Sequence, residues 1–174
     1  EITAIAGDNR LGGDDIDRAI AAYFCQENGL SEEWLAPSLR ASLYRQAETA
    51  KIALSSAPAA SIFLQQGERR YSLLLTNDLL RQLCGPVFQR VRAVITRAMK
   101  DRSRGGRLSD VILVGGSAQL TVFGDFLEGL FGRRPHVAAA PDEIVALGVG
   151  LCAGIKERAE ELQDLVMTDV CPFS

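Results

Sequence analysis

The sequence predicts an α/β fold, because segments with helical periodicity alternate with short segments typical of strands. Two observations carry this prediction. The run Val111 to Val114 is continuously apolar, as expected of a strand buried on both faces of a sheet. The segments Ser61 to Leu64 and Arg70 to Leu75, joined through Gln66-Gly67-Glu68, predict an antiparallel hairpin. With 174 residues, of which 47% are hydrophobic, the chain is long enough to bury a core.

The first half of the chain opens on a strand-like segment, Ile2 to Ala6, followed by the turn-rich Gly7 to Gly13. A helix is predicted next, because acidic residues favour a helix N-terminus and apolar residues then recur at helical spacing. A second amphipathic helix is predicted from Pro37 to Ser55-Ser56. The residues that carry these two predictions are Asp14, Asp15, Asp17, Ile16, Ile20, Tyr23 and Phe24, and then Leu39, Leu43, Ala47, Ala50 and Leu54.

The second half begins with a long helix, predicted after Thr76 because a hydroxyl at that position suits an N-cap. Its apolar stripe comprises Leu80, Leu83, Val87, Val91 and Val94. The basic run Lys100 to Arg107 contains two glycines, and we interpret it as a solvated loop that closes this helix. Two further helices are predicted, one around Phe123 to Phe131 and one from Pro141 to about Glu161.

Charge and cysteine spacing argue against several classes of protein. A net charge of -3 argues against nonspecific binding to nucleic acid or membrane, since either needs a concentrated basic surface. The cysteines are Cys25, Cys84, Cys152 and Cys171. They form no C-x-x-C pair and have one possible imidazole companion, His136, so neither a zinc site nor a disulfide framework is expected. Unpaired cysteines and the lack of a signal segment predict a cytoplasmic protein. Because Glu1 leads straight into a strand-like segment, we also expect the sequence to be a piece of a longer chain.

Two segments carry residues suited to hold a ligand. Gly115-Gly116-Ser117 follows the predicted strand, and glycine lets the backbone approach a ligand closely, although Gly-Gly also serves simply to turn a chain. Glu48, Lys51 and Ser55 lie three and four residues apart on one side of a helix. They either converge on a ligand or include an ordinary surface ion pair between Glu48 and Lys51.

Other polar residues are less informative. Asp142 stands at the start of the last predicted helix, where the helix dipole favours a carboxylate with or without a ligand. Gly12-Gly13 fits either a bend near phosphate or a plain turn. Trp34 and His136 show no partner pattern and are interpreted as structural or surface residues. The sequence holds neither a Ser-His-Asp pattern nor a Walker P-loop.

Four motifs follow one another along the chain. Residues 7–17 read G-D-N-R-L-G-G-D-D-I-D, and residues 47–56 read A-E-T-A-K-I-A-L-S-S. Residues 110–117 read D-V-I-L-V-G-G-S, and residues 141–148 read P-D-E-I-V-A-L-G. In sequence and in order they resemble the corresponding motifs of the DnaK-type heat-shock chaperone family. The apolar segment Leu165 to Asp169 resembles that family's interdomain linker, and the T-D-V-C-P ending is most similar to its HscC branch.

The resemblance implies a fold and a division into parts. The chain would be lobe II of an actin-like ATPase, a ribonuclease-H-like half with an inserted helical and β-hairpin subdomain. The core subdomain would comprise residues 1–11 and 84–160, the insertion residues 12–83, and the linker and start of the substrate-binding domain residues 161–174. In the full-length parent, ATP binding and hydrolysis would be coupled to the binding of client peptides through the substrate-binding domain. Partners would be a nucleotide-exchange factor, a J-domain cochaperone, and the parent's own lobe I.

The resemblance also implies a site for ATP or ADP with Mg²⁺, with no catalytic residue and no metal ligand in this part of the chain. From the insertion, the ribose and adenine would be held by Glu48, Lys51 and Ser55. From the core subdomain, the adenosine would be held by Gly115, Gly116, Ser117 and Asp142. Gly13 would lie near the phosphates. Gln119 stands where many relatives place an adenine-stacking arginine, which should cost on the order of a kcal/mol of affinity. The family's first phosphate loop and catalytic residues are absent from this sequence, so we expect an ATPase parent and an inactive isolated lobe.

Two alternatives stay open on the sequence. Sugar or carboxylate kinases and filament-forming proteins share the actin-like fold but not the linker, and this chain offers no candidate base for a kinase. A binding module is the other alternative, presenting the insertion to an exchange factor and the linker face to a J-domain without ATP turnover. For either an ATPase lobe or a module, the surface that meets lobe I should be unusually apolar.

Overall fold

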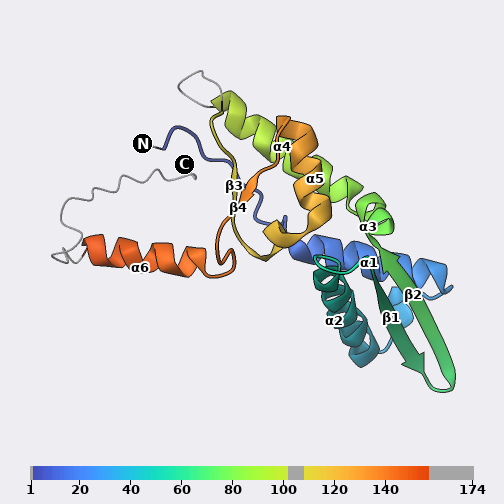
Figure 1. Ribbon diagram of the computed structural model, residues 1–174. Coiled ribbons are helices and arrows are strands. Elements are labelled where there is room, and N and C mark those ends of the chain that lie inside the picture. The colour runs from blue at the N-terminus through green and yellow to red at the C-terminus, as the bar shows by residue number, and fades with distance from the viewer. Residues whose placement is uncertain (1, 102–107, 157–174) are drawn as a thin grey trace.

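The computed structural model describes residues 2–101 and 108–156, which form helices and two separate two-stranded sheets (Figure 1). In chain order the elements are α1 (Gly13–Glu27), η1 (Glu32–Trp34), α2 (Pro37–Ala53), β1 (Ala59–Gln66), β2 (Arg69–Thr76), α3 (Asn77–Leu83), α4 (Gly85–Asp101), β3 (Ile112–Leu113), η2 (Gly116–Gln119), α5 (Thr121–Phe131), β4 (His136–Val137) and α6 (Ile144–Lys156). The predicted α/β class is confirmed. The linker motif and most of the basic run Lys100 to Arg107 lie outside the described residues.

Helix α1 begins where the acidic residues predict it. The carboxylate of Asp15 accepts a hydrogen bond of 2.9 Å from the backbone N–H of Gly12, which satisfies one of the donors that a helix start leaves unpaired. The apolar stripe of this helix, including Ile16, Ile20 and Phe24, is buried. Helix α2 starts at Pro37, a favoured first helical residue, and buries Leu43, Ala47, Ala50 and Lys51.

The predicted hairpin is confirmed. Strands β1 and β2 pair antiparallel from Ala59 opposite Thr76 to Gln66 opposite Arg69, and Gly67 turns the chain with a φ of 61°. Alternation then directs one set of side chains inward and the other outward. Ile62, Leu64 and Leu75 are buried on the inner face, whereas Phe63 and Leu74 are exposed.

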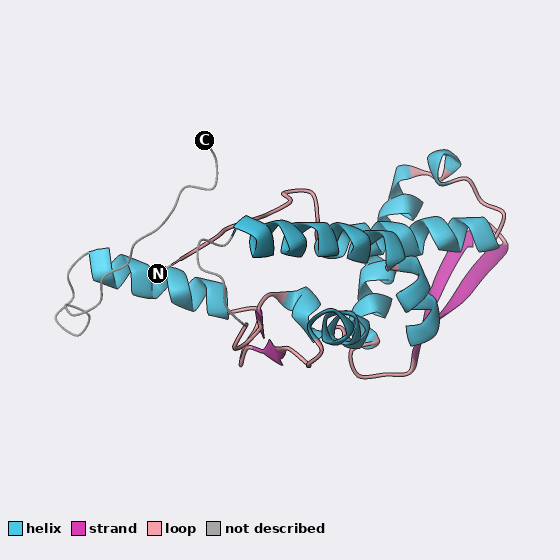
Figure 2. Ribbon diagram, turned by 90° about the horizontal axis from the view of Figure 1, so that it is seen from above, coloured by secondary structure: helices cyan, strands magenta, loops and turns pink. Residues whose placement is uncertain are grey.

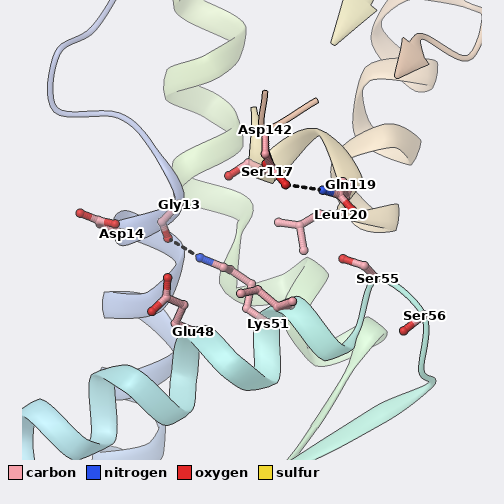
Figure 3. A pocket seen from close by; sticks show the side chains of 12 residues that line it. Gly13, Asp14, Glu48, Lys51, Ser55, Ser56, Ser117, Gln119, Leu120 and Asp142 are labelled. Carbon is pink, nitrogen blue, oxygen red and sulfur yellow. Dashed lines mark hydrogen bonds between the residues drawn. The ribbon is translucent and has the colours of Figure 1, made fainter. Parts of the chain in front are cut away.

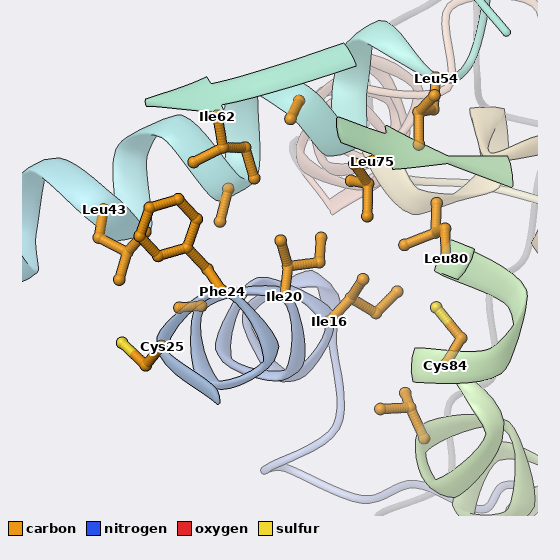
Figure 4. Packing of buried hydrophobic residues seen from close by; sticks show 14 of the residues in the cluster. Ile16, Ile20, Phe24, Cys25, Leu43, Leu54, Ile62, Leu75, Leu80 and Cys84 are labelled. Carbon is orange, nitrogen blue, oxygen red and sulfur yellow. The ribbon is translucent and has the colours of Figure 1, made fainter. Parts of the chain in front are cut away.

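One hydrophobic core joins α1, α2, the hairpin and α3 (Figure 4). Phe24 and Ile20 of α1 lie beside Leu43 of α2 and Ile62 of β1, all with no exposed surface. Leu120, between η2 and α5, and Val122 of α5 belong to the same core. This core therefore fixes the start of α1, the side of α2 and the segment around Leu120 relative to one another.

The long helix predicted after Thr76 is wrong in its extent, although its N-cap is confirmed. The hydroxyl of Thr76 accepts a hydrogen bond of 3.3 Å from the backbone N–H of Leu79. Helix α3 then ends at Leu83, and α4 starts at Gly85. Pro86 explains the break, because proline has no N–H to donate to the carbonyl four residues earlier and its ring crowds that carbonyl.

Two strand predictions are also wrong. Ile2 to Ala6 forms no strand, and the run Val111 to Val114 contributes only the two residues of β3, paired in parallel with β4. Ile112 is 68% exposed, so this strand is not buried on both faces. A strand becomes buried only where neighbours flank it and other layers cover it, and among the described residues β3 has one short neighbour.

Helix α6 begins at Ile144, three residues later than predicted. The N–H groups of Glu143 and Ile144 both bond to the carbonyl of Ala140, so Pro141 and Asp142 belong to a turn. The helix projects away from the rest of the molecule (Figures 1 and 2). Its exposed apolar residues include Val145, Leu147, Val149 and Leu151. None of the helices in the described part of the chain has the length and apolarity needed to cross a membrane.

Candidate functional site

A pocket of about 610 Å³ lies where five segments of the chain meet (Figure 3). These segments are the start of α1, one side of α2, the turn that follows α2, the η2 loop, and the turn before α6. The volume falls within the range of roughly 300–1,000 Å³ typical of small-molecule sites. The lining residues are Gly13, Asp14, Glu48, Lys51, Ile52, Ser55, Ser56, Gly116, Ser117, Gln119, Leu120 and Asp142.

Almost every site residue that the sequence indicated lines this pocket. Gly13, Glu48, Lys51, Ser55, Gly116, Ser117 and Asp142 are all part of its wall. Gly115 is not among them. Its backbone has a φ of 86° and a ψ of 163°, a region populated essentially by glycine, and its N–H donates a 2.7 Å hydrogen bond to the carbonyl of Pro141. Gly115 therefore shapes the loop and ties it to the turn that holds Asp142.

Two glycines allow polar groups to approach the backbone at the pocket wall. A methyl group placed on Gly13 would lie 3.1 Å from Lys51 Nζ and 3.2 Å from Ser117 Oγ. A methyl group on Gly116 would lie 3.1 Å from Asp142 Oδ1. All three distances are shorter than ordinary van der Waals contacts. At these positions glycine allows a close approach as well as a turn.

Lys51 pairs with Asp17 of α1 and not with Glu48, so the surface ion pair suggested by spacing does not form. Its ammonium lies 2.8 Å from both carboxylate oxygens of Asp17, donating a hydrogen bond to Oδ2, and 3.3 Å from the carbonyl oxygen of Gly13. Both side chains of the pair are 9% exposed. Burial raises the pKa of Asp17, while the hydrogen bond from Lys51 opposes that rise.

Asp142 faces the η2 loop. Its Oδ2 accepts a hydrogen bond of 3.1 Å from Nε2 of Gln119, and its Oδ1 lies close to Gly116 (Figure 3). The carboxylate of Asp142 is therefore part of the pocket wall. This contact is separate from the favourable effect that the dipole of α6 has on a carboxylate at its start. Gln119 lines the same pocket and places a neutral amide at this wall.

Sequence reasoning missed several lining residues and the buried partner of Lys51. Ile52 and Leu120 add apolar surface, and Asp14 and Ser56 add polar groups. For Asp17 the sequence indicates only an acidic residue that the helix dipole favours. Its position directly after Ile16, at the edge of the apolar stripe of α1, was the available signal that this carboxylate faces inward.

Trp34, His136, Cys25 and Cys84 lie outside this pocket. Trp34 is 86% exposed and the His136 side chain 75% exposed, as expected of surface residues. Cys25 and Cys84 are buried thiols, and burial raises the pKa of Cys84 to about 11. Across residues 2–101 and 108–156, no group of three or more His, Cys, Asp or Glu side chains is placed to hold a metal ion.

Comparison with known proteins gives a consistent result over the whole chain. The family model described as Hsp70 protein matches residues 1–174. The chain is 32% identical to "Chaperone protein dnaK" of Thalassiosira pseudonana and 31% identical to that of Phaeodactylum tricornutum. It is 32% identical to "Heat shock 70 kDa protein 7, chloroplastic" of Arabidopsis thaliana. These alignments cover 100% of this chain but 30% of the length of the two dnaK proteins and 25% of the Arabidopsis protein. The chain belongs to the Hsp70 protein family.

Proposed function

We propose that this chain is the adenosine-holding lobe of the ATPase domain of a DnaK-like chaperone. In the full-length protein this domain would couple ATP binding and hydrolysis to the binding of client peptides. The observation that carries the proposal is the pocket of about 610 Å³, in which all the predicted site residues except Gly115 converge from five segments. Family membership makes an ATPase the natural parent and disfavours the kinase and filament alternatives.

The residues of the pocket fit a nucleoside. Hydroxyl groups of a ribose need paired donors and acceptors, which the ammonium of Lys51 and the carboxylate of Glu48 supply from one side of α2. Gly116 allows the backbone to approach the ligand, and Ser117 adds a hydroxyl group. Ile52 and Leu120 supply the apolar surface that a base requires. ATP with Mg²⁺ would supply the phosphoanhydride bond that is cleaved, and the groups that act on that bond would come from outside this chain.

The remaining parts of the proposal concern the parent protein. We place the core subdomain at residues 1–11 and 84–160 and the inserted subdomain at residues 12–83, in an actin-like lobe II that is inactive alone. The exposed apolar residues of α6 support the existence of a covering partner, which we assign to lobe I. A J-domain cochaperone and a nucleotide-exchange factor would be the external partners. An HscC-like identity and a cytoplasmic location complete the proposal.

Isothermal titration calorimetry with ADP and Mg²⁺ tests the proposed site. The variant Glu48→Ala, Ser55→Ala removes two polar groups from the pocket wall and leaves the buried pair of Lys51 with Asp17 intact. We expect it to bind ADP at least about tenfold more weakly than the unmodified chain, because two ligand hydrogen bonds are lost. The control variant Glu33→Ala, Ser38→Ala makes the same two changes at exposed positions outside the pocket and should bind normally. Equal affinity in all three proteins would refute the assignment.

A further inference from the structure

Residues 7–12 form an irregular segment that leads into α1 and has little apolar packing to hold it. The segment contains a turn at Asn9 and Arg10 and neither helix nor strand. Leu11 is its one apolar side chain and packs, partly buried, against the hydrophobic core. Segments with few buried apolar contacts open at a lower free energy than a core does. Polar contacts therefore supply most of what keeps this segment, which we call the strap, in place.

Two arginines of α4 make these polar contacts. Arg97 donates a hydrogen bond of 2.6 Å to the carbonyl oxygen of Gly7. Arg90 donates from Nη2 to Asp8 Oδ2 at 2.8 Å and to the carbonyl oxygen of Arg10 at 2.9 Å, and from Nε to Asp8 Oδ2 at 3.3 Å. The planar guanidinium presents five N–H groups in a fixed arrangement, so one side chain can hold several acceptors at once. Arg90 therefore binds both the side chain and the backbone of the strap.

Asp15 connects these contacts to the start of α1. Its Oδ1 lies 3.3 Å from Nη1 of Arg90, and its Oδ2 accepts a hydrogen bond of 2.9 Å from the backbone N–H of Gly12. Arg18, also on α1, pairs with the same Oδ1 at 2.8 Å. One carboxylate thus links α4, the last residue of the strap and the first turns of α1. Gly13, the next residue, lines the pocket described above.

We infer that Arg90 holds a strap closed: its contacts keep residues 7–12 on α4, and the strap opens by itself, without unfolding of the core, when they are broken. The charged groups are partly exposed, with side-chain exposures of 42% for Arg90 and 30% for Asp8. Dissolved salt should therefore weaken their attraction. Opening would release the residue that precedes Gly13 at the pocket wall. The inference concerns a motion of the chain and is independent of the ligand that the pocket takes.

Amide hydrogen exchange, measured by NMR on the 174-residue chain, tests this inference. The reporter is the N–H of Gly12, which donates to Asp15 in the closed strap, and the reference is the N–H of Ile20, a residue with no exposed surface. In the variant Arg90→Gln the protection of Gly12 against exchange should fall about tenfold, because several charge-assisted hydrogen bonds are lost. In the unmodified chain, added NaCl should lower the protection of Gly12 as well.

Urea separates opening of the strap from unfolding of the whole protein, because the urea dependence of exchange grows with the surface that becomes exposed. Low urea concentrations should leave the protection of Gly12 unchanged, both in the unmodified chain and in Arg90→Gln. The same urea concentrations should lower the protection of Ile20 in both proteins. The control Arg92→Gln removes an equal charge from α4, where Arg92 lies over the ring of Phe126, and should leave the protection of Gly12 as it is.

Asp8→Asn provides a second variant, because it removes the charge that Arg90 binds and keeps an oxygen for the N–H of Arg10. It should lower the protection of Gly12 when introduced alone and have no further effect in Arg90→Gln, since both changes break the same contact. Two results would overturn the inference: a protection of Gly12 that Arg90→Gln leaves unchanged, or one that falls with urea as that of Ile20 does. Neither result involves nucleotide binding, so the proposed function is tested separately.

Discussion

Cys84 lies between α3 and α4 with no exposed surface, and burial raises the pKa of its thiol to about 11. Because the thiolate is the reactive form, we predict that iodoacetamide at pH 8 leaves Cys84 unmodified in the folded protein and alkylates it fully in urea. Peptide mass spectrometry after timed alkylation measures this. Alkylation of folded protein at the rate seen in urea would show that the core around Leu80 and Cys84 opens readily.

Single residues show where sequence reasoning succeeds and where it stops. The spacing of Glu48, Lys51 and Ser55 placed them on one side of a helix, and they do line one pocket. The partner of Lys51 was not predictable, because Asp17 lies on another helix and the two meet only through the packing of α1 against α2. Local spacing ranks candidate partners within a helix, whereas burial of a charge depends on the tertiary structure.

Thr76 connects two elements, since it ends β2 and caps α3. Its hydroxyl accepts a hydrogen bond of 3.3 Å from the N–H of Leu79. We predict that Thr76→Ala lowers the free energy of unfolding by about 1 kcal/mol, because that N–H loses its partner at the helix start. Urea unfolding followed by circular dichroism measures the change. Thr76→Ser keeps the hydroxyl and should be close to the unmodified protein, and an equal loss in both variants would contradict the capping role.

Arg90 ties the irregular segment before α1 to helix α4. Its guanidinium lies 2.8 Å from Asp8 Oδ2 and 3.3 Å from Asp15 Oδ1, and it donates a hydrogen bond to the carbonyl oxygen of Arg10. The hydrogen bond from Arg90 lowers the pKa of Asp8 below its ordinary value of 3.8, and Arg18, with a smaller contribution from Arg90, lowers that of Asp15. A carboxylate whose pKa is lowered by folding stabilises the folded protein at pH values above its ordinary pKa.

This arrangement predicts a specific pH dependence. As the pH falls below about 4, the unfolded chain binds protons at Asp8 and Asp15 before the folded protein does. The folded protein therefore loses stability progressively, until the pH has fallen through the lowered pKa values of these two carboxylates. We predict a smaller loss in Arg90→Gln between pH 5 and pH 3, measured as the shift of the thermal midpoint. The raised pKa of Asp17 makes the opposite contribution to the pH dependence of stability. That contribution is present in the unmodified protein and in Arg90→Gln alike. Lys100→Gln removes an equal charge from the same helix, and an identical slope in Arg90→Gln and in this control would contradict the account.

Whole elements were predictable to the extent that their signals are local. Helices α1, α2 and α5 and the β1–β2 hairpin follow from apolar periodicity, caps and turn residues close in sequence. The strand predictions at Ile2 to Ala6 and Val111 to Val114 failed because a strand depends on neighbours elsewhere in the chain. Pro86 is a local signal for the break between α3 and α4, which the apolar stripe that continues across it does not show.

At the scale of the molecule, the pocket depends on a core that spans most of the described chain. Residues as distant as Gly13 and Asp142 meet because Leu120 and Val122 pack into the same core as α1 and α2. By contrast, α6 leaves several apolar side chains exposed, with Val149 at 64%. The described residues therefore form the pocket by themselves, whereas the exposed apolar side chains of α6 support the covering partner that we propose.

The most direct test of the central claim is an amide NMR titration of the chain with ADP and Mg²⁺. The account predicts that the backbone amide signals of Gly13, Ile52, Gly116 and Ser117 shift with one common dissociation constant. Signals of Gly67 at the hairpin tip, far from the pocket, should stay in place. Shifts confined to α6 or the hairpin, or no shifts at saturating ADP, would contradict the claim that this pocket holds the nucleoside.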